Sequence, residues 1–257
     1  MFNQFRDAAE YVKKEGIELV DLLYSDLWGH LHHLTLSSRE FTPLVMSEGV
    51  GFDGSSVGFK HVQAGDMVLI PDLGTGFVDP FHNVPTLAFL CNIHEADTKE
   101  LYLFDPREMV RRAENLMIAS GIADKSLWGP EFEFYLFDQI MLKNTPSLTL
   151  CQIDSAEANW GTYLNPNGYS LPDHQGYHAA PPCDNYFEIR DEIVVTLGKM
   201  GIPVKYHHHE VGGPGQSEIE TPMLGINTAG DAAMLIKYAV KMVAMRAGKT
   251  ATFLPKP

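Results

Sequence analysis

The chain has 257 residues, of which 45% are hydrophobic, and a formal net charge of −14. This length is enough for a sizeable core and for one large or two modest domains. The negative charge, with no basic run to offset it, argues against binding to nucleic acid or to an anionic membrane. No stretch approaches the roughly 18 consecutive apolar residues of a membrane span. The composition therefore predicts a soluble protein that binds neither nucleic acid nor membrane.

The cysteines predict neither a disulfide framework nor a metal site. Cys91, Cys151 and Cys183 form no closely spaced pair. A sparse, odd number of cysteines is typical of reduced thiols in a cytosol. We expect them to be small buried hydrophobic residues.

The first hundred residues predict a small α+β domain. Apolar residues at helical spacing predict a helix over residues 3–15, which Gly16 ends. Strands are expected at residues 17–24, 31–36, 66–70 and 86–93, the first two joined as a hairpin. A glycine-rich loop at 51–58 carries one acid and two hydroxyls. Two interpretations of this loop stay open, a phosphate cradle and an ordinary surface loop, because it lacks the Gly-Lys-Ser/Thr ending of a P-loop.

Regular elements alternate with loops over the rest of the chain. Asp105 and Pro106 predict the start of a helix that runs to about Ser120. Residues 139–182 carry little regular signal, which indicates hairpins or a functional loop. Further elements are expected: a helix at 184–200, an apolar helix from 228 or 231 through 247, and a strand at 250–254.

Residues 128–138 open on a Gly-Pro turn and then alternate as a strand does. Phe132, Phe134 and Leu136 are expected on one face, towards a core, with Glu131 and Glu133 on the other. Two neighbouring carboxylates repel each other, and a bound cation is the simplest way to relieve this. A solvated outer sheet face is the alternative interpretation.

A second acidic site follows downstream. Strands at 204–211 and 216–221, joined by the turn 212–215, form a predicted hairpin that brings Glu210 and Glu218 together. With Glu131 and Glu133 the set comprises four carboxylates, which suits Mg²⁺ or Mn²⁺ better than Zn²⁺. A zinc site formed by the histidines at 207–209 is disfavoured, since adjacent strand residues face opposite ways.

Several motifs together resemble type I glutamine synthetases. They occur in the order of that family, at residues 52–56, 66–72, 129–134, 207–218 and 248–253. The resemblance implies an α+β fold with a β-grasp domain at 1–100. The first part of the catalytic domain, a curved antiparallel sheet with flanking helices, would follow at 101–257. It also implies a cytoplasmic homo-oligomer, commonly a dodecamer of two stacked hexamers.

The resemblance also implies the roles of single residues. Glu133, Glu210 and Glu218 match ligands of one divalent ion, Mg²⁺ or Mn²⁺, and Glu131 matches a ligand of a second ion. Asp53, lent by a neighbouring subunit, matches the residue that takes a proton from ammonium. Four further site residues are implied, namely Ser56 and Tyr177 beside Asp53, and His208 and Lys205 on the cofactor side.

The implied reaction joins L-glutamate and ammonia to give L-glutamine, with ATP forming γ-glutamyl phosphate on the way. Two departures from the family pattern are evident. The Asn-Gly-Ser-Gly-Met-His segment of the family and its later arginines are missing, so these residues alone are expected to form an incomplete and inactive centre. Lys205 stands where many relatives carry a nucleotide-contacting glutamate.

Two alternatives remain open at this point. One is a γ-glutamyl-amine ligase of the same superfamily, which would use an amine in place of ammonia. The other is a non-catalytic, ring-forming relative that binds metal or a partner without turnover. Retention of all four acids counts against the second alternative, because a homologue without activity has no need to keep four like charges close together.

Overall fold

The computed structural model describes residues 2–160 and 168–257. The chain divides into two compact units, and each is described by itself. Unit 1 comprises Met1–Leu127 and Gly225–Met234. Unit 2 comprises Trp128–Leu224 and Leu235–Pro257.

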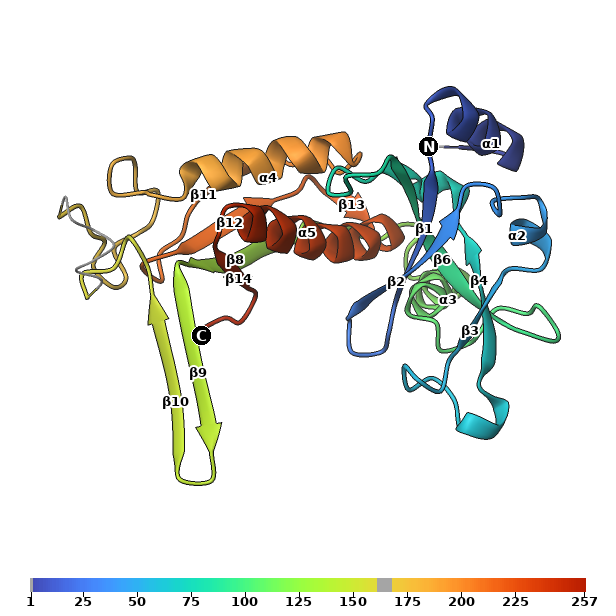
Figure 1. Cartoon of the computed structure of the whole chain (residues 1–257), viewed down its shortest axis with the longest axis horizontal. Coiled ribbons are helices and arrows are strands. Elements are labelled where there is room, and N and C mark those ends of the chain that lie inside the picture. Colours follow the sequence, from blue (N-terminus) through green and yellow to red (C-terminus); the bar gives the residue numbers. More distant parts are fainter. Residues whose placement is uncertain (1, 161–167) are drawn as a thin grey trace. The chain divides into compact units, whose positions relative to one another are not determined.

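Unit 1 is built on a mixed sheet (Figure 1). In spatial order its strands are β2 (Leu31–Ser37), β1 (Leu19–Ser25), β6 (Thr86–Glu95), β4 (Asp66–Pro71) and β3 (Val50–Asp53), with β5 (Phe77–Val78) also paired to β6. β1 and β6 are parallel, whereas β1 and β2 form the predicted antiparallel hairpin. The sequence pattern did not predict β3, because residues 50–53 form a strand only through pairing with the distant β4.

Helices and short 3₁₀ turns accompany this sheet in unit 1. Their bounds are α1 (Phe5–Lys14), α2 (Leu44–Ser47), the 3₁₀ turns η1 (Val62–Ala64) and η2 (Leu73–Thr75), and α3 (Pro106–Ala119). Ala8 and Val12 of α1 join the core around Leu22 and Phe89. Asp105 caps α3 as predicted, because its carboxylate accepts a hydrogen bond from the Arg107 N–H at 3.1 Å.

Unit 2 contains an antiparallel sheet, here called the C-terminal sheet. Its strands lie in the order β11 (Tyr206–His209), β12 (Gln216–Glu220), β8 (Glu131–Phe137) and β14 (Thr250–Thr252). The predicted strand at 250–254 stops at Thr252, because the Leu254 N–H turns back to the Thr252 hydroxyl. The short strands β7 (Leu127–Trp128) and β13 (Leu224–Gly225) pair with each other.

The hairpin interpretation of residues 139–182 is confirmed for its first part. β9 (Gln139–Thr145) and β10 (Leu148–Asp154) form a two-stranded ribbon that stands away from the C-terminal sheet (Figure 1). Residues 161–167 lie outside the described residues. Cys91 is buried as predicted, but the same prediction for Cys151 is wrong, since this thiol lies exposed on β10.

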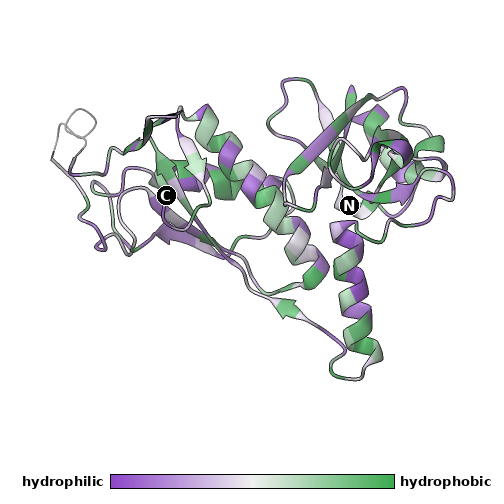
Figure 2. Cartoon of the chain, turned by 90° about the horizontal axis from the view of Figure 1, so that it is seen from below, coloured by the Kyte–Doolittle hydropathy of each residue, from purple (hydrophilic) through white to green (hydrophobic). Residues whose placement is uncertain are grey.

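Two helices complete unit 2. α4 (Phe187–Lys199) begins two residues later than Asp184 as its predicted cap would place it: Tyr186 holds the cap position, and Asp184 pairs with Arg190. α5 (Ile226–Arg246) begins earlier than predicted, and its first part belongs to unit 1. Hydropathy alternates along the helices in Figure 2, as expected for helices with one buried face. Among the described residues, no helix has the length and hydropathy needed to cross a membrane.

Candidate functional site

The C-terminal sheet has two chemically different faces. Phe134 and Leu136 are fully buried on one face, whereas Glu131 and Glu133 are exposed on the other, as the alternation predicted. The register places Glu218 opposite both Glu133 and His208. The acid-bearing face is here called the acidic face, and it carries Glu131, Glu133, His208, Glu218 and Glu220, with Glu210 just beyond β11.

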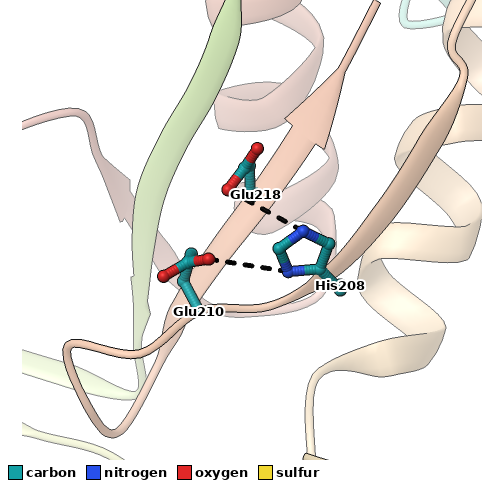
Figure 3. Close-up of side chains that lie close together, drawn as sticks. All are labelled: His208, Glu210 and Glu218. Atoms are coloured by element: carbon teal, nitrogen blue, oxygen red, sulfur yellow. Dashed lines mark ion pairs between the residues drawn. The ribbon is translucent and has the colours of Figure 1, made fainter. Parts of the chain in front are cut away.

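Two groups of potential metal ligands converge on the acidic face. Ligand atoms of His208, Glu210 and Glu218 all lie within 4.8 Å of one another. The imidazole points between the two carboxylates, 3.8 Å from each (Figure 3). A second group, equally close, comprises Glu131, Glu218 and Glu220. Glu218 belongs to both groups, so the two candidate positions share one ligand.

The electrostatics of Glu218 show how unfavourable this arrangement is for the metal-free chain. Burial raises the pKa of Glu218 to about 7, and the nearby charges of Glu210 and Glu131 act in the same direction. His208 opposes them. A carboxyl group with so high a pKa gains from a positive charge placed beside it. The donor set is therefore suited to a divalent cation.

Glu133 does not join either group in the described structure. Its carboxylate accepts a hydrogen bond from the side-chain amide of Gln216, which lies 2.7 Å away. It nevertheless faces Glu218 across the two strands. Its predicted role as a metal ligand stays a prediction.

The three neighbouring histidines have three different partners, so they do not form one site. His207 faces Asp191 at 3.0 Å, and burial lowers its pKa. His209 faces Glu157 at 2.9 Å, and His208 faces Glu210 and Glu218. This confirms the expectation that strand alternation separates the imidazoles.

The models of two known protein domains match the chain. The β-grasp domain of glutamine synthetase matches residues 16–96, and the catalytic domain of glutamine synthetase matches residues 103–257. The chain belongs to the glutamine synthetase family. The α+β fold prediction, a β-grasp domain followed by a catalytic domain with a curved sheet, is thereby confirmed.

Curated glutamine synthetases cover this chain from end to end. The enzyme of Frankia alni is 39% identical to this chain and that of Streptomyces filamentosus is 40% identical. Each alignment covers 100% of this chain and 55% of the relative. A cryo-EM structure of Plasmodium falciparum glutamine synthetase superposes with a TM-score of 0.89 at 25% identity. The match covers 100% of this chain and 51% of that one. The chain therefore spans about half the length of the relatives it matches.

The resemblance to glutamine synthetases assigned His208 and Lys205 to the cofactor side. The structure places His208 beside Glu210 and Glu218, where it is also a potential metal ligand, and its cofactor role stays a prediction. Lys205 forms an ion pair with Glu220 at 2.6 Å and lies over the Tyr206 ring. Glu220 was missed altogether, although the alternation Glu218-X-Glu220 was the available signal.

Tyr177 lies beside the metal-ligand groups. Its ring stacks on His178, with 4.1 Å between ring centroids, and lies edge-on to His208 at 5.4 Å. A cavity of about 560 Å³ opens here, lined by these three residues and by Tyr206. The loop and the strand thus present Tyr177 and His208 to the same space.

Asp53 and Ser56 lie in unit 1, at the end of β3. The carboxylate of Asp53 accepts hydrogen bonds from the Ser55 N–H at 2.9 Å and the Ser56 hydroxyl at 2.8 Å. Hydrogen bonds from Ser55 and Ser56 lower the pKa of Asp53. The structure thus joins two of the predicted catalytic residues in one ionised, solvent-facing group.

Proposed function

We propose that this chain is the metal-binding part of a glutamine synthetase, which joins L-glutamate and ammonia through γ-glutamyl phosphate at the expense of ATP. The observation that supports the proposal is the pair of ligand groups sharing Glu218, on a chain whose catalytic domain belongs to this family. The proposed domains are 1–100, the β-grasp domain, and 101–257, the first part of the catalytic domain.

The acidic face is the proposed site of two divalent cations, Mg²⁺ or Mn²⁺. Glu210, Glu218 and Glu133 would hold one ion, with His208 close enough to be a further ligand. Glu131 would hold the other, together with Glu218 or Glu220. When bound, such ions neutralise phosphate charge and orient a phosphoryl group for transfer.

Asp53 is proposed as the group that handles ammonium. Its carboxylate is ionised at neutral pH, as an aspartate ordinarily is, and the hydrogen bonds from Ser55 and Ser56 favour the charged form that attracts a cation. Its carboxylate then accepts a proton, which leaves neutral ammonia as the nucleophile. The Ser56 hydroxyl holds one carboxylate oxygen in place. We propose that Asp53 serves the site of a neighbouring copy and that Tyr177 helps to enclose the ammonium.

The nucleotide is proposed to lie near Lys205 and His208. Lys205 pairs with Glu220 and lies over the Tyr206 ring, which places its ammonium group at the edge of the acidic face. A cation at this position suits an anionic phosphate better than the glutamate of many relatives would. We therefore propose a phosphate or ribose contact for Lys205.

The protein is proposed to act as a cytoplasmic homo-oligomer. A two-stranded ribbon is marginally stable in water by itself. The ribbon β9–β10 exposes large hydrophobic residues, namely Met141, Leu142, Leu148 and Leu150. Covering them with a second copy would stabilise the ribbon, so sedimentation should show an assembly that Leu142→Ser weakens.

Phosphate release from ATP tests the proposed activity. Glutamate, ammonium and Mg²⁺ are supplied to this chain alone, and then with the C-terminal half of a full-length relative added as a second polypeptide. Activity that appears only with the second polypeptide is expected, since the chain spans about half of its relatives. Methylamine competing with ammonium would indicate an amine ligase. No turnover in either case, with Mn²⁺ still bound, would indicate a non-catalytic relative.

A further inference from the structure

Glu157 is a buried carboxylate with no part in the chemistry described above. It follows β10 and is fully inaccessible to solvent. An isolated ionised carboxylate in the interior is costly, so a buried one persists only with several partners. Its partners therefore indicate what it holds in place.

Three segments of unit 2 donate hydrogen bonds to this one carboxylate. One oxygen accepts from the Asn185 N–H at 2.7 Å, just before α4. The other accepts from the Gly215 N–H at 2.6 Å and faces His209 Nε2 at 2.9 Å. Glu157 thus ties the start of α4 to both sides of the turn between β11 and β12.

His209 extends this connection to the candidate site. Its Nδ1 donates to the backbone carbonyl of Glu210 at 2.8 Å. Its own carbonyl accepts from the His178 N–H at 3.0 Å. The ring therefore holds the main chain of a proposed metal ligand, while its backbone holds the loop that carries Tyr177.

Close packing leaves these segments little freedom to shift. A Cβ on Gly176 would lie 2.5 Å from the Glu210 carbonyl oxygen and from the His209 ring. Gly215 has φ +83°, a conformation that side-chain-bearing residues rarely adopt, and its carbonyl accepts from the Leu136 N–H at 2.9 Å. The turn is consequently fixed between β8 on one side and Glu157 on the other.

We propose that Glu157 and His209 form a positioning pair that sets the divalent-cation affinity of the acidic face without contacting the ion. The pair fixes the main chain of Glu210 and the turn at 212–215, and so the direction of the Glu210 carboxylate. The inference rests on the proposed metal-binding function. Partners that orient metal ligands typically contribute about 10–100-fold to metal affinity.

Direct Mn²⁺ titration, followed by the electron paramagnetic resonance of the free ion, tests this inference on the chain itself. In Glu157→Gln, the amide nitrogen cannot accept, so at least one of the three donors loses its partner. We expect Mn²⁺ affinity to fall about 10–100-fold while circular dichroism reports a folded chain. Unchanged affinity in this variant would overturn the proposal.

Asp21→Asn is the matched control. Asp21 is also a buried carboxylate that faces a histidine, His33 at 3.1 Å, but it belongs to unit 1. Its substitution is expected to lower the unfolding midpoint and to leave Mn²⁺ affinity within about twofold. An equal loss of affinity in both variants would mean that general destabilisation is the cause, and would overturn the positioning role.

His209→Gln decides the matter if Glu157→Gln does not fold. Glutamine keeps a donor for Glu157 but has no second nitrogen for the Glu210 carbonyl. A folded variant with weakened Mn²⁺ binding would support the proposal, and one with full affinity would overturn it. If the unaltered chain binds no Mn²⁺, the metal-binding function itself fails, which is a different result.

Discussion

The two faces of the C-terminal sheet differ in whether their charged side chains have partners of opposite charge. On the face packed against α4, Arg190 pairs with Asp184, and His209 pairs with Glu157, all of them buried. On the acidic face, Glu131, Glu210 and Glu218 have no lysine or arginine partner among the described residues. Charges are therefore compensated where they hold the fold together, whereas on the acidic face only Glu220 has a lysine partner, Lys205, among the described candidate ligands.

The largest effect on stability is expected from breaking an ion pair on the face packed against α4. Asp184→Ala would leave the guanidinium of Arg190, which is 1% exposed, without its ionic partner. Removing one member of a buried pair costs about 3–5 kcal/mol. Urea unfolding should show a loss of this size. Glu10→Ala, which breaks an exposed pair with Arg6, is the control and should cost no more than about 1 kcal/mol. Similar losses in the two variants would contradict the comparison.

Removing a charge from the acidic face should stabilise the metal-free chain, whereas removing one from the buried pair destabilises it. Glu218→Gln removes a ligand shared by both candidate positions, so Mn²⁺ affinity should fall by more than about 100-fold, beyond the effect of an orienting partner. The same change removes a charge that its neighbours disfavour, so the metal-free chain should unfold at a higher temperature at pH 8. Calorimetry without metal checks this sign. A lower midpoint would mean that the acidic face stabilises the fold.

The pH dependence follows from the pKa of Glu218, which is about 7 in the folded chain against 4.5 for an unperturbed glutamate. Because the folded state binds this proton more tightly, the group should stabilise the metal-free chain as pH falls from 7 towards 5. Mn²⁺ must displace the same proton, so its affinity should drop by up to about tenfold per pH unit below 7. Titrations at several pH values measure the slope. Glu218→Gln should lack it, whereas an equal slope in that variant would assign the proton to another group.

Local patterns predicted much of this site, and long-range contacts supplied the rest. The alternation in β8 placed Glu131 and Glu133 correctly on the exposed face, since a strand's period is set by its own backbone. Strand β3 could not be found in this way, because its pairing with β4 depends on residues elsewhere in the chain. The role of Glu157 could not be predicted either, because its contact with His209 joins residues that lie far apart in the sequence.

The smallest effect is expected at Lys205, which forms an ion pair with Glu220 on the acidic face. Its side chain is about half exposed, so Lys205→Ala should cost no more than about 1 kcal/mol of stability. The same change frees the Glu220 carboxylate and removes a positive charge near the proposed ions. Mn²⁺ affinity should therefore rise by up to about fivefold, the equivalent of about 1 kcal/mol.

The control for this effect is Lys13→Ala, which removes the same charge from α1 in unit 1. It should leave Mn²⁺ affinity unchanged, because Lys13 forms no ion pair with any of the described candidate ligands and the charge of an exposed lysine is screened at ordinary ionic strength. The rise in Lys205→Ala should also shrink as salt is added, since the Lys205 side chain lies at the surface. An equal rise in both variants would mean that net charge alone governs cation binding. The local arrangement of Glu131, Glu218 and Glu220 would then contribute nothing specific to Mn²⁺ affinity.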